Sequence, residues 1–256
     1  MFNLVTLSTV AIALVHSATA NDKRGIAFPA SNPAGDLAKA GGAQASWVYN
    51  WSPNAPSNNP GLTFIPMQWG SADIGSLAAT VKTLGAKTIL GFNEPDMSAQ
   101  SNLSPTDAAN LWKQYIQPLK SSGVALGAPA VSSSEGSQTW LTNFINACGS
   151  TCTFDFVPVH WYGDGAENFE NYVTAFHKTF NYPIWVTEFG STSTDATEVA
   201  TFLTQTVNWL DQQSYVQKYS WFAFARPEAG SPLDTWLLDA SGNVDSLGNS
   251  YLTDTS

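Results

Sequence analysis

The chain has 256 residues with a net charge of −10, three histidines and two cysteines, and charged residues make up 12% of it. An acidic chain of this kind is a poor partner for nucleic acid or an anionic membrane, which carry the same sign of charge. So few histidines and cysteines also argue against a zinc site or a redox centre, and we expect no metal and no cofactor. The low charge and the many hydroxyl and amide side chains favour a neutral, hydroxyl-rich ligand.

The N-terminal segment contains no charged side chain over residues 1–20, runs apolar from Leu4 to Val15 and ends in Ala18-Thr19-Ala20. This pattern predicts a secretory signal peptide over residues 1–20, although the usual basic residue is missing. We therefore expect secretion, to the outside of the cell or to the cell wall, because the apolar run is too short to span a membrane. Lys23-Arg24 is a candidate processing site that would leave one domain over 25–256; an ordinary exposed Lys-Arg pair is the alternative.

From residue 25 onward, short apolar runs alternate with segments of helical periodicity, and the alternation repeats eight times. Such alternation is typical of parallel strands with helices packed outside them. Eight repeats in about 230 residues predict the α/β class and a compact, single-domain (β/α)8 TIM barrel rather than an open sheet. We expect a monomer. The predicted strands are 25–28, 47–50, 63–67, 88–92, 125–128, 156–161, 184–187 and 220–223, and the predicted helices are 36–40, 74–84, 105–121, 138–147, 167–180 and 196–213. A short helical piece over 54–59 is the remaining candidate, but the stretch from Pro53 to Pro60 is rich in Pro, Asn and Ser and favours an irregular loop in place of a regular second helix.

Local signals mark the ends of several helices. Ser104 is a predicted N-cap with a proline at the next position, and Asp195 begins a predicted capping box. Gly85 and Gly123 each stand between a helical segment and a strand, where a left-handed glycine commonly ends a helix.

The two cysteines, Cys148 and Cys152, enclose only three residues. In a secreted protein they are expected to form one small disulfide; two free thiols are the alternative. Asn50-Trp51-Ser52 and Asn102-Leu103-Ser104 match the sequon for N-glycosylation and are candidate acceptors.

Two glutamates stand at the ends of predicted strands. The fourth strand ends at Asn93-Glu94, where Pro95 stops it, and the seventh ends just before Glu188. The carboxyl ends of the strands form the catalytic face of a barrel, so both carboxylates are expected to reach one substrate. An acid that protonates the leaving oxygen and a carboxylate that attacks or activates water suffice for glycoside hydrolysis. The alternative for Glu94 is an ordinary loop carboxylate near a helix N-terminus.

These strand ends also carry a resemblance to a known family. The motifs around Glu94 and Glu188 look like the fourth- and seventh-strand signatures of the retaining clan A barrels, and further strings resemble glycoside hydrolase family 128. The resemblance runs from Arg24 to about Phe224. The strings are Gly91-Phe92-Asn93-Glu94-Pro95-Asp96, Trp185-Val186-Thr187-Glu188-Phe189-Gly190, Arg24-Gly25-Ile26-Ala27-Phe28, Trp47-Val48-Tyr49-Asn50-Trp51, Phe64-Ile65-Pro66-Met67-Gln68-Trp69-Gly70 and Val159-His160-Trp161-Tyr162.

The resemblance implies a retaining, endo-acting β-1,3-glucanase of fungal type, whose partner is a β-1,3-glucan. It implies Glu94 as acid/base, Glu188 as nucleophile and Asn93 as a contact to the sugar 2-hydroxyl. A physical argument supports the first role, because an ionised Glu188 keeps a proton on Glu94 by its like charge. The alternatives are a related clan A barrel that acts on another β-linked polysaccharide and a non-catalytic glucan-binding protein of the cell wall.

Further candidate contacts lie near the strand ends. His160 and Tyr162 share one face of the sixth strand, so both are expected to face the barrel mouth. There Tyr162 is expected to hydrogen-bond Glu188, and His160 to hold Glu94 or a sugar hydroxyl; a core histidine is the alternative. Candidate sugar platforms are Tyr49, Trp51, Trp69 and Trp221, each with core packing as the alternative. Weaker polar candidates are Gln68, Asp96, Glu135, Arg226 and Glu228, whereas Trp112, Trp140, Trp161, Trp185 and Trp209 are expected to pack away from the sugar.

Overall fold

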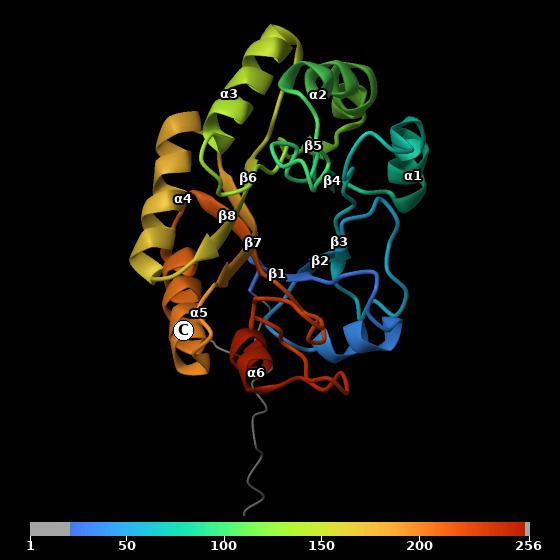
Figure 1. Ribbon diagram of the computed structural model, residues 1–256. Helices are drawn as coiled ribbons and strands as arrows, with labels where there is room; N and C mark the ends of the chain where they lie inside the picture. Colours follow the sequence, from blue (N-terminus) through green and yellow to red (C-terminus); the bar gives the residue numbers. More distant parts are fainter. Residues whose placement is uncertain (1–20, 254–256) are drawn as a thin grey trace, which may run out of the picture.

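The computed structural model of the protein describes residues 21–253, so the predicted signal peptide lies outside the described residues. Eight parallel strands form the centre of the fold, and helices surround them (Figure 1). The strands are β1 (Arg24–Ala27), β2 (Trp47–Tyr49), β3 (Thr63–Phe64), β4 (Thr88–Ile89), β5 (Ala125–Leu126), β6 (Val157–Gly163), β7 (Ile184–Ser191) and β8 (Val216–Trp221).

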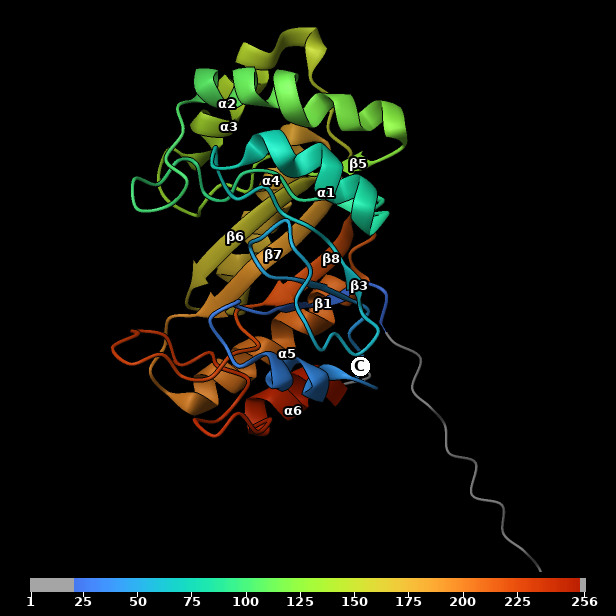
Figure 2. The same ribbon diagram turned by 90° about the vertical axis from the view of Figure 1, so that its right-hand side faces the viewer.

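The strands close into a ring. One hydrogen-bonded sheet has the order β3-β2-β1-β8-β7-β6, and β4 pairs with β5. Single parallel bridges join Met67 to Leu90 between β3 and β4, and Gly127 to Phe156 between β5 and β6. Figure 2 shows β6, β7 and β8 running side by side, as their parallel pairing requires. The ring confirms the predicted (β/α)8 barrel.

The helices follow the predicted order with two differences. Residues 54–59 form a loop, so the short helical piece is absent and the irregular loop expected over 53–60 is confirmed; Pro56 would interrupt a helix, and Asn58 adopts a left-handed φ of 58°. The sequence did not indicate α6. The helices are α1 (Leu77–Leu84), α2 (Pro105–Leu111), α3 (Ser137–Cys148), α4 (Ala166–Phe180), α5 (Ala196–Gln212) and α6 (Ser246–Thr253), with short 3-10 helices at Ala34–Ala40, Ile74–Ser76, Gln117–Ser122 and Gly149–Thr151 and a π-helical turn at Trp112–Ile116.

Aromatic rings fill the inside of the barrel. The ring of Phe156 stacks on that of Trp185 with centroids 3.9 Å apart, and Trp47 lies 5.7 Å from Trp185. Glycines on neighbouring strands make room for them, because a Cβ atom would lie 2.1 Å from the Trp47 ring at Gly25 and 2.5 Å from the Phe156 ring at Gly127. The inside of the barrel is therefore a packed core and not an open channel.

Both predicted N-caps form, but the capping box at Asp195 does not, because Glu198 accepts from the Ser193 hydroxyl and the Asp195 N–H donates to Ser193. The Ser104 side chain accepts a hydrogen bond of 3.1 Å from the backbone N–H of Asp107, and Asp195 accepts one of 2.8 Å from that of Thr197. The two predicted terminal glycines adopt left-handed φ angles of 62° and 76°. These caps satisfy backbone groups that a helix leaves unpaired at its ends.

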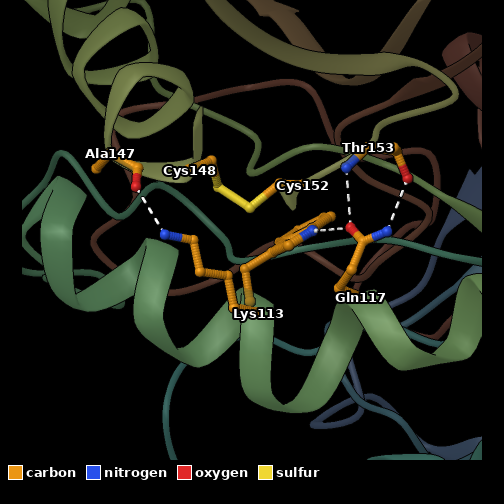
Figure 3. Close-up of a disulfide and its surroundings, with 7 residues drawn as sticks. Lys113, Gln117, Ala147, Cys148, Cys152 and Thr153 are labelled. Atoms are coloured by element: carbon orange, nitrogen blue, oxygen red, sulfur yellow. Dashed lines mark hydrogen bonds between the residues drawn. A yellow bond between two sulfur atoms is a disulfide. The ribbon is translucent and has the colours of Figure 1, made fainter. Parts of the chain in front are cut away.

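The Cys148–Cys152 disulfide is formed at the end of α3, with Cα atoms 5.4 Å apart (Figure 3). Lys113 donates a hydrogen bond of 2.8 Å to a carbonyl in the last turn of α3. Gln117 exchanges hydrogen bonds of 2.8 and 2.9 Å with Thr153, just after the disulfide. The disulfide therefore stabilises the contact between α3 and the helical segment before β5, away from the catalytic face.

The predicted dibasic pair is part of the folded barrel. Arg24 begins β1 and is fully buried, and the Lys23 ammonium donates three hydrogen bonds to carbonyls at the end of α5. The bond between Arg24 and Gly25 therefore lies inside strand β1 in the folded domain. Within residues 21–253, no helix combines the length and the apolar character needed to cross a membrane.

Candidate active site

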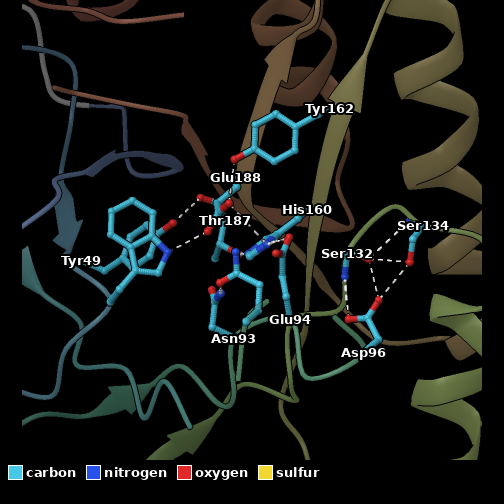
Figure 4. Close-up of polar contacts among 12 residues, drawn as sticks. Tyr49, Asn93, Glu94, Asp96, Ser132, Ser134, His160, Tyr162, Thr187 and Glu188 are labelled. Atoms are coloured by element: carbon cyan, nitrogen blue, oxygen red, sulfur yellow. Dashed lines mark hydrogen bonds and ion pairs between the residues drawn. The ribbon is translucent and has the colours of Figure 1, made fainter. Parts of the chain in front are cut away.

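Glu94 lies where the chain leaves the barrel after β4. Its backbone N–H donates a hydrogen bond of 2.7 Å to the carbonyl of Ala130, and the N–H of Asn93 donates one of 2.9 Å to that of Trp69. Residues 93 and 94, although past the end of β4, therefore keep hydrogen bonds to the segments that follow the two neighbouring strands, β3 and β5. Glu94 itself adopts a left-handed φ of 39°, which is uncommon for a residue with a side chain. This backbone turn directs the Glu94 carboxylate toward His160 (Figure 4).

Glu188 lies in β7, and its side chain is only 7% exposed. The Tyr162 hydroxyl donates a hydrogen bond of 2.7 Å to Oε2, as predicted, and the Trp51 indole N–H donates one of 2.7 Å to Oε1. Each carboxylate oxygen therefore has its own neutral donor. Hydrogen bonds to an ionised acceptor are short and strong, so this pair holds the carboxylate in one orientation.

His160 is fully buried between the two carboxylates. Its Nδ1 atom lies 2.9 Å from Oε1 of Glu94 and 3.5 Å from Oε2 of Glu188, while Nε2 lies 3.0 Å from Oγ1 of Thr187. Burial opposes charge on the imidazole, but the carboxylates of Glu188 and Glu94 outweigh it and raise the pKa of His160 above its ordinary value. The contact with Glu94 is one of the two contacts expected for His160.

The environment of Glu188 also shifts its ionisation. Burial raises the pKa of Glu188 above its ordinary value, and the nearby Glu94 carboxylate acts in the same direction. His160, Tyr162 and Trp51 act in the opposite direction, because a positive charge and hydrogen-bond donors stabilise the carboxylate. Glu188 is therefore a desolvated carboxyl group, and its hydrogen-bond donors Tyr162 and Trp51 favour the ionised form that can react.

The two carboxylates lie close together. One ligand atom from each of Glu94, His160 and Glu188 lies within 4.8 Å of the other two. Within residues 21–253, this is the one cluster of three such side chains whose ligand atoms lie close enough together to hold a metal ion.

The comparisons with known proteins agree with this geometry. A family model described as "Glycosyl hydrolase catalytic core" matches residues 25–251. A subgroup III curdlan-specific exo-β-1,3-glucanase of family 128 from Blastomyces gilchristii, in complex with glucose, is 32% identical; the match covers 92% of this chain and 99% of that one, with a TM-score of 0.80. A subgroup IV endo-β-1,3-glucanase from Lentinula edodes is 29% identical, with 91% and 100% covered and a TM-score of 0.78. The chain belongs to glycoside hydrolase family 128.

A longer relative also matches this family 128 chain. The alkali-sensitive linkage protein 1 of Schizosaccharomyces pombe is 34% identical over 241 residues, which is 90% of this chain. The same match covers 44% of that protein, so the chain spans less than half the length of this relative.

Two of the four candidate sugar platforms are buried in the family 128 barrel. Tyr49 is fully buried inside the ring of strands, where its hydroxyl donates a hydrogen bond of 2.9 Å to the carbonyl of Thr187. Trp221 is also fully buried, and its indole N–H donates one of 2.7 Å to the carbonyl of Thr235. Neither ring can face a sugar, so both predictions are corrected. These side chains instead fix the strands on either side of the site.

Trp69 and Trp51 remain accessible. Trp69 follows β3 next to Asn93 and is 37% exposed, an unusual exposure for so large an apolar side chain. Trp51 is half-buried and lines a pocket of about 540 Å³ beside Glu188. That size is typical of small-molecule sites. Other walls of the pocket are Asn32, Phe222, Arg226, Glu228 and Trp236.

The sequence did not single out Phe222 or Trp236 as pocket residues. Phe222 directly follows β8, so its position at a strand end was an available signal. Trp236 comes from the irregular segment after β8, whose path has no periodic pattern to predict it. Arg226, a weaker candidate, also binds Asp36 through hydrogen bonds of 2.6 and 3.0 Å, which closes one side of the pocket.

The remaining polar candidates separate into structural and exposed residues. Gln68 is buried, and its amide donates hydrogen bonds of 2.8 and 2.9 Å to two carbonyls of the next loop, so it stabilises that loop rather than facing a ligand. Asp96 binds the loop after β5, and Glu135 is exposed. Of the two sequon residues, Asn102 is exposed, whereas Asn50 is buried with its amide donating to a nearby carbonyl.

The predicted core tryptophans are packed away from the site. Trp161 lies between barrel and helices, stacked on Phe202 with ring centroids 5.4 Å apart. Trp112 and Trp185 are buried, and Trp140 and Trp209 are half-buried against the core.

Proposed function

We propose that this protein is a retaining glycoside hydrolase that cleaves internal β-1,3-glucosidic bonds, with Glu94 as acid/base and Glu188 as nucleophile. The observation that carries the proposal is the close approach of the two carboxylates, of which one oxygen each lies within 4.8 Å. Retaining enzymes place their carboxyl groups about 5–5.5 Å apart, whereas inverting ones leave about 6.5–9.5 Å for a water. Both named family 128 neighbours are described as β-1,3-glucanases, which supports the substrate.

The first step would form a covalent intermediate. An oxygen of Glu188 attacks the anomeric carbon, the bond from that carbon to the glycosidic oxygen breaks, and Glu94 transfers its proton to the leaving oxygen. Tyr162 and Trp51 keep Glu188 in position for the attack. The product of this step is a glycosyl ester on Glu188 and a free sugar chain.

The second step would release the sugar. Glu94 has given up its proton in the first step, and it now acts as base. It takes a proton from water, whose oxygen attacks the anomeric carbon while the ester bond to Glu188 breaks. His160 can stabilise the Glu94 carboxylate in this step through its hydrogen bond of 2.9 Å.

Asn93 is suited to bind a sugar hydroxyl next to the reacting carbon. Its side chain is buried, and within the described part of the chain its Oδ1 atom has no hydrogen-bond partner. Its amide donates to Gln100 at 3.3 Å, which fixes the side chain. A buried polar atom is normally satisfied, so a ligand hydroxyl is the expected partner of Oδ1. This supports the role that the family resemblance implies for Asn93.

Cleavage inside a glucan chain requires binding surfaces on both sides of the carboxylates. Trp69 lies beside Asn93 and Glu94, and the pocket behind Trp51 lies beside Glu188. Apolar faces in both places support contacts with successive sugar rings. Of the two family 128 neighbours named above, one is described as endo-acting and the other as exo-acting. Product analysis is therefore needed to distinguish internal cleavage from cleavage at a chain end.

The test combines product analysis with two isosteric variants. On laminarin we expect a series of short β-1,3-linked oligosaccharides with β-configured new ends, seen by NMR early in the reaction. Glu94→Gln and Glu188→Gln should each lower hydrolysis at least about 10²- to 10⁴-fold, and Glu167→Gln on exposed α4 should not. First-formed α-anomers would refute retention, and a single released sugar would refute internal cleavage. Laminarin binding without hydrolysis by the wild type would support a glucan-binding protein instead.

We also propose that the protein acts outside the cytosol. The support is the disulfide between Cys148 and Cys152, a bond that persists mainly in oxidising compartments. N-terminal sequencing of protein recovered from the culture medium tests this proposal, and a mature chain that begins at Asn21 is the expected result. Retention of the protein inside the cell with residues 1–20 attached would contradict it.

A further inference from the structure

The backbone at Glu94 requires support from its surroundings. Glu94 adopts a left-handed φ of 39° immediately after the strand register ends, and its side chain is only 12% exposed. A residue with a side chain keeps such a backbone conformation only where several contacts with its neighbours stabilise it. On one side the support is the barrel ladder, because the Glu94 N–H donates to the Ala130 carbonyl at 2.7 Å and the Ala130 N–H donates to that of Phe92 at 2.9 Å.

The second attachment is made by the side chain of Asp96. Its Oδ1 accepts a hydrogen bond of 3.1 Å from the backbone N–H of Ser132, and its Oδ2 accepts hydrogen bonds from the hydroxyls of Ser132 at 2.5 Å and Ser134 at 3.3 Å (Figure 4). All three donors belong to the loop that follows β5. Asp96 thus connects the loop after β4 to the loop after β5, two residues beyond Glu94.

The segment that receives both attachments is itself anchored. Ser132 is buried, and its carbonyl accepts a hydrogen bond of 3.4 Å from the hydroxyl of Tyr172 on α4. The N–H of Met97 donates to the Glu94 carbonyl at 3.0 Å and closes the turn between Glu94 and Asp96. Glu94 therefore lies in a short turn whose two ends are both tied to residues 130–134.

We propose that Asp96 is a positioning residue for Glu94: it fixes the turn that aims the acid/base carboxylate, and it contacts neither substrate nor the reacting atoms. The inference rests on the proposed function, because it assigns Glu94 the task of protonating the leaving oxygen. The hydrogen-bond partners of Asp96 are neutral groups, which assigns it a geometric role; its charge also raises the pKa of His160, so a variant without the charge must separate the two effects. A displaced Glu94 would still leave Glu188 held by Tyr162 and Trp51.

The test uses two substrates that differ in their need for an acid. A laminari-oligosaccharide has a leaving oxygen that must be protonated, whereas the same glycone with a dinitrophenyl leaving group departs without a proton. We expect Asp96→Ala to lower kcat/KM about 10- to 100-fold on the oligosaccharide, the size of loss that a small misplacement of a catalytic group causes, and less than about 3-fold on the dinitrophenyl substrate.

Two further variants separate positioning from folding and from charge. Asp96→Asn keeps an acceptor for the Ser132 N–H and a donor for its hydroxyl, so it should retain activity within about 3-fold of wild type on both substrates. Ser132→Ala removes one donor and keeps the backbone N–H; it should show a smaller loss that is again confined to the oligosaccharide. If Asp96→Ala does not fold, the result for Ser132→Ala tests the positioning role of Asp96. Glu167→Ala, which removes an exposed carboxylate on α4, is the control.

The outcomes that contradict the inference are distinct from those that contradict the proposed function. Equal losses of Asp96→Ala on the two substrates, or no loss on the oligosaccharide, would overturn the positioning role alone. A large loss in Asp96→Asn on both substrates would also overturn it, because charge rather than geometry would then be required. Wild-type protein that hydrolyses neither substrate would overturn the proposed function and this inference with it.

Discussion

The indole N–H of Trp51 donates a hydrogen bond of 2.7 Å to Oε1 of Glu188, although 137 residues separate the two in the chain. Trp51 follows β2 with a left-handed φ of 56°, and its ring lies against those of Tyr49 and Phe222, with centroids 4.7 and 5.8 Å away. The same side chain lines the pocket that Phe222 and Trp236 also line. Trp51 therefore links the proposed nucleophile to the surface on which a sugar would bind.

Replacement of Trp51 by phenylalanine should weaken catalysis and move its pH dependence. A hydrogen bond to a charged group contributes about 1.5–3 kcal/mol, so kcat should fall about 10- to 100-fold. The donor lowers the pKa of Glu188, and its loss should move the acid limb of the kcat/KM profile to higher pH. Tyr162→Phe should shift the limb in the same direction.

Trp140→Phe is the matched control for this experiment. Its indole N–H donates a hydrogen bond of 2.9 Å to the carbonyl of Leu103, away from the carboxylates. We expect this variant to lower thermal stability and to leave the pH profile unchanged. An equal pH shift in Trp140→Phe would show that the Trp51 effect is not specific to Glu188.

The wild-type pH profile should reflect the burial of Glu188. Burial raises the pKa of Glu188 above its ordinary value of 4.5, and the nucleophile must be ionised to attack. Activity should therefore be lost as the pH falls through a midpoint that lies above 4.5. The pH dependence of kcat/KM on a neutral oligosaccharide measures this midpoint, and a value at or below 4.5 would contradict the expected desolvation.

Trp69→Ala should affect substrate binding more than turnover. Trp69 is 37% exposed beside Asn93, and loss of one aromatic contact costs about 0.5–1.5 kcal/mol. We expect KM for laminarin to rise about 2- to 10-fold with kcat nearly unchanged. Leu84→Ala is the control, because Leu84 is similarly exposed, at 39%, but lies at the end of α1 that faces the start of β4. Equal KM changes in the two variants would argue against a sugar contact at Trp69.

Arg24→Ala should lower stability and leave catalysis intact. The buried guanidinium donates hydrogen bonds of 2.6 Å to the Tyr251 carbonyl and 3.0 Å to the Tyr219 hydroxyl, and it lies 3.6 Å from Asp211. Breaking a buried charged network costs about 3–5 kcal/mol in the free energy of unfolding, which urea denaturation measures. Lys82→Ala, an exposed change, should cost little. A loss below about 1 kcal/mol for Arg24→Ala would show that the network is not required.

Local patterns in the sequence were enough to predict the barrel and its two central carboxylates. The alternation of strand and helix periodicity counted the eight units, and the strand ends placed Glu94 and Glu188 on one face. The helix ends at Ser104 and Asp195 were equally predictable, because capping depends on residues within one turn. The loop over 53–60 was predictable for a related reason, because prolines override the weak helical pattern of 54–59.

Tertiary structure alone decided which aromatic side chains reach the substrate and which hold the fold. Strand alternation assigns Tyr49 and Trp51 to the same face of β2, but one is fully buried in the barrel and the other lines the pocket. How deep a side chain lies along the barrel axis depends on the aromatic rings and glycines of neighbouring strands. These strands are distant in the sequence, so no local pattern predicts that depth. The partners of Glu188 and Asp96 are likewise set by contacts between distant segments. The sequence by itself determined the fold and the family, whereas the packing of the closed ring determined the geometry of the site.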